Sequence, residues 1–183
     1  MTWLLVEDDG DIRNVVAIMM TVWGEKPLAF PDGTSAWAWL DSVASGSYPG
    51  ELPSLALMDI RMPGYTGDKL AARIRQTDSL KNIPIILMTA FSLTEAEINA
   101  MREQSGIDHL INKPLPDMDV FKSTIYRIRD ERKLKNVPLS PVPGVAQPAT
   151  LPVVAVALVA PSLVAPNVVA PISSSAVPPK KDS

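Results

Sequence analysis

Apolar and polar positions follow two patterns along the first 135 residues, and the two patterns take turns. Short apolar runs, typical of buried strands, are separated by stretches in which apolar residues recur every three or four positions, as in amphipathic helices. The runs predict these strands: Thr2–Val6, Lys26–Phe30, 55–59, 84–89 and His109–Asn112. The spaced stretches predict these helices: Asp11 to about Gly24, 34–44, from Gly67 onward, 94–104 and Met118–Lys135.

Single residues mark the ends and the inner sides of some of these helices. Asp11 is the first candidate for the N-cap of the first helix, and Asp9 and Asp11 are both interpreted as capping residues, because an aspartate side chain accepts hydrogen bonds from the free N–H groups there. Gly24 is the predicted stop of that helix. The last helix carries an apolar stripe that we expect to face the core: Met118, Phe121, Ile125 and Ile128.

Five strand–helix units with apolar strands favour an α/β fold, a doubly wound five-stranded parallel sheet with helices on both faces. Right-handed crossovers place the carboxyl ends of all the strands at one edge of the sheet. In open α/β sheets, ligands bind in the crevice outside those ends. Residues at the strand ends are therefore the first candidates for function.

The composition changes near Asn136, and we predict a domain over residues 1–135 and a Pro/Ala/Val-rich disordered tail over residues 136–183. The tail holds three of the thirty-seven charged side chains and ten of the eighteen prolines. Residues 151–171 carry no charge and repeat Val-Ala-Pro every five residues, a period that fits neither helix nor strand. Because prolines interrupt this segment, an extended chain is favoured over a membrane-spanning helix. Docking of the apolar tail to a partner stays open as a hypothesis.

Composition and charge exclude several classes of function. A net charge of −3 gives no electrostatic footprint for nucleic acid, so we expect no nucleic-acid partner. The chain has no cysteine, which excludes disulfides, thiolate catalysis and cysteine-bound metal. The N-terminal apolar run is too short, and lacks the basic flank, for a secretory signal. We therefore expect a cytoplasmic protein with no membrane partner.

Polar residues stand at the ends of four of the predicted strands: Glu7, Asp8, Asp59, Thr89 and Lys113. Three carboxylates in one site stay ionised together only when a cation joins them. Oxygen ligands without histidine or cysteine select a hard ion, and Mg²⁺ fits best because it also bridges to phosphate oxygens. The predicted cofactor is therefore Mg²⁺. A carboxylate between this ion and the Lys113 ammonium group is suited to form an aspartyl-phosphate, with the Thr89 hydroxyl as a further donor.

These residues, in this order and each at a strand end, resemble the receiver domain of two-component response regulators. The motifs that match lie within residues 1–132: Glu7-Asp8, Asp59 before Met62-Pro63-Gly64, Thr89-Ala90 and Lys113-Pro114. The resemblance implies a single-domain, CheY-like protein with a flavodoxin-like sheet of strand order 2-1-3-4-5.

The resemblance also implies a role for each residue. Asp59 would be the phosphoacceptor and a metal ligand, Asp8 the direct Mg²⁺ ligand and Glu7 its water-mediated partner. The backbone carbonyl of Arg61 would complete the metal's ligands. Lys113 would pair with Asp59 before phosphorylation and with the phosphoryl group afterwards.

Phosphorylation is expected to draw Thr89 toward the phosphoryl oxygens and to switch a surface over residues 94–132. The bond between Lys113 and Pro114 is expected to be cis, as in the family. The family often has an aromatic residue where this chain has Leu110, and a leucine can repack but has no hydroxyl to present to a partner.

The implied function is that of a phosphorelay response regulator, which is not itself an enzyme. A sensor histidine kinase or a histidine phosphotransfer protein would supply the phosphoryl group, because the single histidine, His109, is expected to be structural. An output protein that the sequence does not identify would bind the switched surface. Two alternatives stay open. One is a phosphorylation-independent pseudo-receiver, and the other is a Mg²⁺-dependent phosphohydrolase, which usually has an aspartate where this chain has Arg61.

Overall fold

The computed structural model describes residues 1–136. The predicted tail lies outside the described residues from position 137 onward, so its disorder and the domain boundary stay predictions. Within residues 1–136, no helix combines the length and the apolar character needed to cross a membrane.

The centre of the fold is a five-stranded parallel sheet with the order β2-β1-β3-β4-β5. Its strands are β1 (Thr2–Val6), β2 (Lys26–Phe30), β3 (Ala56–Asp59), β4 (Ile85–Thr89) and β5 (His109–Asn112). Every residue of β1, β3 and β4 is buried, as expected for strands that are covered on both faces. The predicted fold class and strand order are confirmed.

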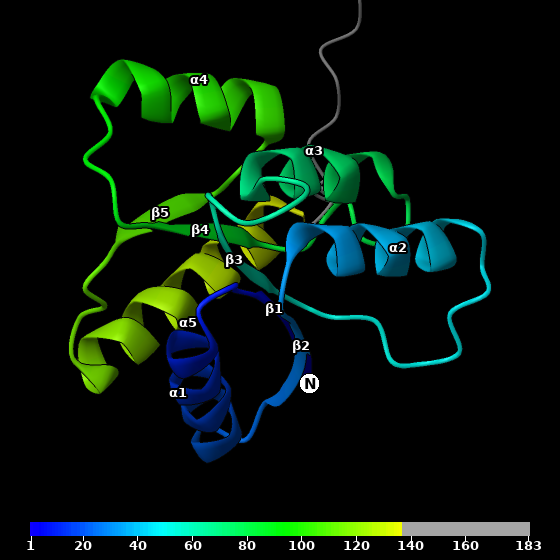
Figure 1. The fold of residues 1–183 in the computed structure, drawn as a ribbon, viewed down its shortest axis with the longest axis horizontal. Helices are drawn as coiled ribbons and strands as arrows, with labels where there is room; N and C mark the ends of the chain where they lie inside the picture. The colour runs from blue at the N-terminus through cyan, green and yellow to red at the C-terminus, as the bar shows by residue number, and fades with distance from the viewer. Residues whose placement is uncertain (137–183) are drawn as a thin grey trace, which may run out of the picture. The chain divides into compact units, whose positions relative to one another are not determined.

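Helices cover both faces of the sheet (Figure 1). They are α1 (Gly10–Val22), α2 (Gly33–Ala44), α3 (Gly67–Gln76), α4 (Glu95–Ser105) and α5 (Met118–Lys135). α1 and α5 pack on one face around a core that includes Trp3 and Phe121. α2 and α3 pack on the other face around a core that includes Leu40 and Leu70, and α4 contacts α3.

The apolar strand runs place the polar residues that follow them at one edge. Successive side chains of a strand point to opposite faces. In β1, Trp3 and Leu5 accordingly join one core, and Leu4 and Val6 join the other. Apart from Thr2 at the start of β1, the three buried strands β1, β3 and β4 become polar only at or directly after their carboxyl ends, at Glu7, Asp59 and Thr89.

Two local predictions are wrong. The N-cap of α1 is Asp9 and not Asp11, because the Asp9 carboxylate accepts hydrogen bonds from the N–H groups of Asp11 (2.9 Å) and Ile12 (3.0 Å). Asp11 therefore lies inside the first turn. Met118 does not face the core and is 45% exposed, because it is the first residue of α5 and precedes the turns that pack on the sheet. The other three residues of the predicted stripe are buried.

Candidate functional site

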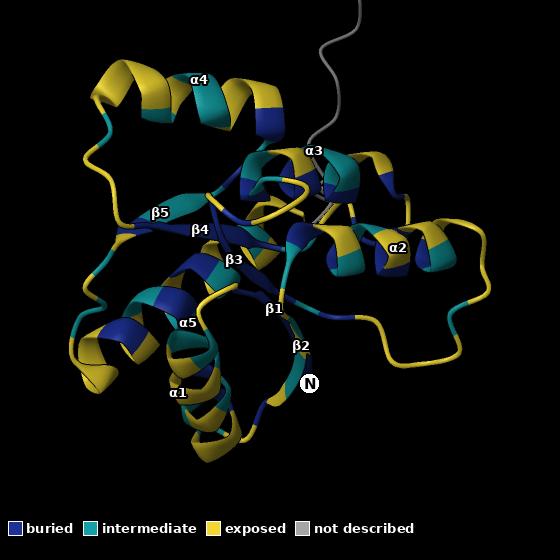
Figure 2. Cartoon of the chain, in the orientation of Figure 1, coloured by how far each residue is buried: buried dark blue, intermediate teal, exposed yellow. Residues whose placement is uncertain are grey.

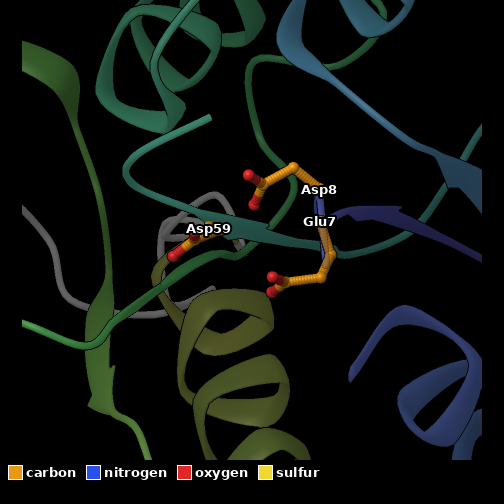
Figure 3. A group of neighbouring side chains, drawn as sticks. All are labelled: Glu7, Asp8 and Asp59. Atoms are coloured by element: carbon orange, nitrogen blue, oxygen red, sulfur yellow. The ribbon is translucent and has the colours of Figure 1, made fainter. Parts of the chain in front are cut away.

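Four strand ends bring the predicted residues to one edge of the sheet. Glu7 and Asp8 follow β1, Asp59 ends β3, Thr89 ends β4 and Lys113 follows β5. These strands are parallel and adjacent in the sheet, so their carboxyl ends are neighbours. Figure 3 shows the side chains of Glu7 and Asp8 extending from the end of β1 toward the side on which Asp59 lies.

Glu7, Asp8 and Asp59 form a carboxylate cluster. One carboxylate oxygen from each residue lies within 4.8 Å of the other two. Among residues 1–136, no other group of three acidic or histidine side chains is arranged in this way. Glu7 and Asp59 are buried and Asp8 is exposed, so the cluster has a closed inner end and an outer end open to solvent.

The ammonium group of Lys113 reaches two of the carboxylates. Its Nζ donates a hydrogen bond to Glu7 Oε1 at 2.8 Å and lies 3.4 Å from Asp59 Oδ1. The sequence indicated a pair with Asp59, and in the structure Glu7 is the closer partner. The Lys113 side chain is 12% exposed, so solvent screens these ion pairs little.

Burial dominates the electrostatics of the cluster. Burial raises the pKa of Glu7 and the pKa of Asp59 above the ordinary carboxyl range, and Lys113 offsets part of both rises. Neighbouring carboxylates add to the effect, since Asp59 raises the pKa of Glu7 and Asp8 raises the pKa of Asp59. The cluster thus contains three carboxylates and one ammonium group, which contacts two of them, and a further cation would complete the charge balance.

An unsatisfied acceptor supports the same conclusion. Glu7 Oε2 is buried and has no hydrogen-bond partner among the described residues. Buried acceptors are normally satisfied by a protein donor, an ordered water or an ion. The donor set consists of oxygens only, and Mg²⁺ takes one or two carboxylates while keeping several waters. The residues therefore fit this ion, which Asp8 and Asp59 would ligate and Glu7 would hold directly or through a water.

The loops that follow β3 and β4 contact each other two residues beyond the strand ends. The Arg61 guanidinium carbon lies 3.9 Å from the centre of the Phe91 ring. The hydroxyl of Thr89, a residue only 1% exposed, accepts a hydrogen bond from the Phe91 backbone N–H at 3.1 Å. The metal-ligand role of the Arg61 carbonyl and the phosphate-sensing role of Thr89 stay predictions.

Arg13 is a residue of the site that the sequence did not reveal. Its Nη1 donates to the backbone carbonyl oxygens of Glu7 (2.7 Å) and Asp8 (3.2 Å). It thereby holds the backbone of the two residues whose side chains enter the cluster. The only sequence signal is a basic residue in the first turn of the following helix, which is common in helices of every function.

Two glycines allow the loop between β3 and α3 to approach its neighbours closely. A side chain at Gly67 would overlap the backbone carbonyl of Asp59, and one at Gly33 would overlap the backbone of Tyr65. The N–H of Gly33 also donates to the carbonyl of Pro63 at 3.1 Å. The start of α2 therefore helps to fix the loop that carries Arg61.

The cis bond predicted before Pro114 is confirmed, and the structural role of His109 stays a prediction. His109 begins β5, at the opposite end of that strand from Lys113, so it lies outside the cluster. Burial lowers its pKa, and the charges of Arg127 and Arg102 lower it further. The peptide bond between Lys113 and Pro114 is cis.

Comparison with known proteins finds one family. The response regulator receiver domain matches residues 3–125. An uncharacterized 14.6 kDa protein of Leptolyngbya boryana is 28% identical over 119 residues, covering 65% of this chain and 83% of that protein. The DNA-binding transcriptional regulator NtrC of Klebsiella pneumoniae is 30% identical over 140 residues, covering 74% of this chain but 27% of NtrC. The chain thus spans most of the first relative and about a quarter of the second.

Solved structures show the same likeness. The receiver domain of a sensor histidine kinase from Pseudomonas aeruginosa PAO1, which has a magnesium ion coordinated in its active site cleft, is 25% identical with a TM-score of 0.57. That match covers 70% of this chain and 97% of the other. A CheY-like receiver domain protein from Methanospirillum hungatei JF-1 has a TM-score of 0.58 at 21% identity, over 73% of this chain and 97% of the other. Because the match to the Methanospirillum protein has only 21% identity, it supports the fold and not a shared function.

Proposed function

The chain belongs to the response regulator receiver domain family, and from this premise we propose that it is a phosphorelay regulator that accepts a phosphoryl group on Asp59. The observation that supports this proposal is the convergence of Glu7, Asp8 and Asp59 at one point, with Lys113 within reach of two of them. A nucleophile, a set of metal ligands and a fixed cation are thus present in one site.

The phosphoryl donor would be a phosphohistidine on a sensor histidine kinase or a histidine phosphotransfer protein. A carboxylate oxygen of Asp59 attacks the phosphorus atom and forms a P–O bond. The P–N bond of the donor breaks, its electron pair returns to the imidazole, and the imidazole takes up a proton from solvent. Bound Mg²⁺ supplies electrostatic stabilisation of the phosphoryl oxygens.

Lys113 and Thr89 would respond to the product. The phosphoryl group adds about −1.5 to −2 charges at Asp59. Lys113 already lies 3.4 Å from the Asp59 carboxylate, so a small movement would pair it with the phosphoryl oxygens. Thr89 would release the Phe91 N–H and donate its own hydroxyl to a phosphoryl oxygen.

The surface of α4, β5 and α5 is the proposed readout. Moving a two-state equilibrium from about 1:99 to 99:1 takes about 5.5 kcal/mol. Charge-assisted hydrogen bonds contribute about 1.5–3 kcal/mol each, so two or three new ones suffice. α4 is suited to move because Ser105 is its only buried residue. Leu110 of β5 packs against the core between the sheet and α2 and α3, and would repack as Thr89 moves. An output protein would then bind the altered surface.

Intact-mass spectrometry tests this proposal. With Mg²⁺ and phosphoramidate as the donor, the unmodified protein should gain the mass of one phosphoryl group, and Asp59→Asn should gain none. Asp11→Asn is the matched control, because Asp11 is an exposed carboxylate near the site and should not affect labelling. Equal labelling of the Asp59→Asn variant would reject Asp59 as the acceptor. Failure of all three to be labelled, with no response to beryllofluoride, would indicate a pseudo-receiver.

A further inference from the structure

Two aromatic rings join α2 to the loop between β3 and α3. Trp37 lies one turn after the start of α2, and Tyr65 lies near the end of the loop. Their ring centroids are 4.0 Å apart and the angle between the ring planes is 16°. No other aromatic pair within residues 1–136 is stacked, since the other pairs are tilted or edge-on. We call Trp37 and Tyr65 the ring stack.

The two rings of the stack have different surroundings. Trp37 is half-buried and packs against the core that α2 and α3 share. Tyr65 is 37% exposed, and most of the loop that carries it is exposed as well (Figure 2). The Trp37 ring is therefore the fixed member of the pair, and Tyr65 is the member that it places.

The Trp37 ring also has a neighbour on α3. The guanidinium carbon of Arg73 lies 5.7 Å from the centre of the ring, and Arg73 Nη2 pairs with Asp41 Oδ1 of α2 at 3.0 Å. Asp41 lies one turn after Trp37, on the same side of the helix. Trp37 is thus placed by two helices, whereas residues 60–66 form neither helix nor strand.

Three contacts hold the end of the loop on the start of α2. The Gly33 N–H donates to the carbonyl of Pro63 at 3.1 Å. Gly64 has a positive φ of 81°, and a side chain there would overlap Thr34. The ring stack is the third contact. Because it joins two side chains, a substitution can remove it while the backbone hydrogen bond stays.

The position of this end of the loop determines where Arg61 lies. The base of the loop is closed, because the Gly67 N–H donates to the carbonyl of Ile60 at 2.9 Å. Arg61 follows that base, and its guanidinium group stacks on Phe91, which is 46% exposed and belongs to another loop. A shift of residues 63–65 would therefore move the Arg61 carbonyl, a predicted ligand of the metal ion.

We propose that Tyr65 is a positioning residue for the metal site and acts through its stack on Trp37. The proposal rests on the proposed function, because it takes the Arg61 carbonyl as a ligand of Mg²⁺. Mg²⁺ demands nearly ideal geometry from its ligands. Without the Tyr65 ring the loop can shift, and the site then binds the ion less tightly.

Calorimetric titration with Mg²⁺ tests the proposal. We expect Tyr65→Ala to raise the dissociation constant about tenfold, the lower end of the effect of losing a residue that orients metal ligands. Tyr65→Leu keeps apolar bulk without a ring and should show the same rise. Tyr65→Phe keeps the ring and should bind the ion as tightly as the unmodified protein. Equal dissociation constants for all four proteins would overturn the proposal.

Tyr48→Ala is the matched control. Tyr48 lies in the loop after α2, is half-buried and packs edge-on against Trp39 of the same helix at 5.7 Å. The variant therefore removes a tyrosine ring from a tryptophan of α2 but leaves the loop that carries Arg61 intact. In urea unfolding it should lose at least as much stability as Tyr65→Ala, while its dissociation constant for Mg²⁺ stays unchanged. Weaker Mg²⁺ binding in both variants, in proportion to lost stability, would overturn the proposal.

The titrations also separate this proposal from the proposed function. If the unmodified protein does not bind Mg²⁺, both the metal site and the role of Tyr65 are rejected. If it binds the ion and Tyr65→Ala binds it equally well, only the role of Tyr65 is rejected. No phosphodonor is present, so the result does not depend on phosphoryl transfer to Asp59.

Discussion

Glu7 is the residue that links the fixed cation of the site to the proposed metal. It is fully buried, pairs with Lys113 through one oxygen and leaves the other oxygen without a partner. Glu7→Gln keeps the shape but removes the charge, so Lys113 would turn to Asp59 and compete with Mg²⁺ for that carboxylate. We expect Mg²⁺ affinity, measured by calorimetry, to fall about 10–100-fold.

A charge change far from the cluster provides the control for this variant. Glu103→Gln removes an exposed carboxylate on α4 and should leave the affinity for Mg²⁺ unchanged. If Glu7→Gln binds the ion as tightly as this control does, Glu7 takes no part in holding it.

His109 gives the protein a predictable dependence of stability on pH. Its pKa is lowered in the folded state, first by burial and then by the charges of Arg127 and Arg102. The unfolded chain therefore binds more protons than the folded one between the lowered value and about 6.5, and stability rises with pH in that window. We expect the free energy of unfolding in urea to fall as the pH is lowered from about 7.5 to 5.5.

Comparison with a variant isolates this effect. Glu7 and Asp59 also have shifted pKa values. Because both residues are present in the unmodified protein and in His109→Gln, their contribution cancels when the two pH profiles are compared. The free energy of unfolding of the unmodified protein, relative to that of His109→Gln, should decrease as the pH falls. Parallel profiles would show that His109 titrates alike in the folded and unfolded states.

At the scale of elements, the start of α2 supports the loop between β3 and α3. A Cβ atom at Gly33 would overlap the backbone of Tyr65, whereas one at Gly10, the first residue of α1, would make an ordinary contact with Arg13 at 3.6 Å. Gly33→Ala should therefore displace the loop and destabilise the fold by roughly 1–3 kcal/mol. Gly10→Ala should stabilise it by about 0.4–1 kcal/mol, because it restricts the unfolded chain.

Thermal unfolding and Mg²⁺ titration of both glycine variants check this expectation. The loop carries the Arg61 carbonyl, so Gly33→Ala should weaken Mg²⁺ binding as well as stability. A Gly33→Ala protein as stable as Gly10→Ala would mean that the loop adapts without cost.

At the scale of the whole molecule, the sequence determined which residues meet but not how they meet. The apolar runs of these strands end on polar residues, and parallel strands have their carboxyl ends at one edge of the sheet, so the convergence of Glu7, Asp59 and Lys113 followed from pattern and topology. Lys113 lies closer to Glu7 than to Asp59 because its side chain extends from the end of β5 past β4 and β3 to the end of β1. No local sequence pattern predicts the direction of such a side chain. The cap of α1 was misplaced because Asp9 and Asp11 are chemically identical. The N-cap is set by the first turn of the helix, in which the Arg13 N–H donates a hydrogen bond to the carbonyl of Asp9.

Asp108 ties distant elements together at the opposite edge of the sheet from the cluster. Its carboxylate accepts hydrogen bonds from Arg75 of α3 (2.8 Å), Arg132 of α5 (3.1 Å) and the N–H of Ile85 in β4 (2.9 Å). Burial, followed by the charge of Arg132, lowers the pKa of Arg75 to about 10. Asp108 is therefore the anion that holds two nearby guanidinium groups together.

Removing Asp108 should leave both cations without their shared partner. We expect Asp108→Ala to lower the free energy of unfolding in urea by about 1.5–3 kcal/mol, because both partly buried guanidinium groups lose their charged hydrogen-bond acceptor. Asp78→Ala is the control, since Asp78 pairs with Lys81 through a side chain that is 95% exposed, and it should cause no measurable loss. A loss for Asp108→Ala no larger than that of the control would show that α3, β4 and α5 are held by their apolar contacts alone.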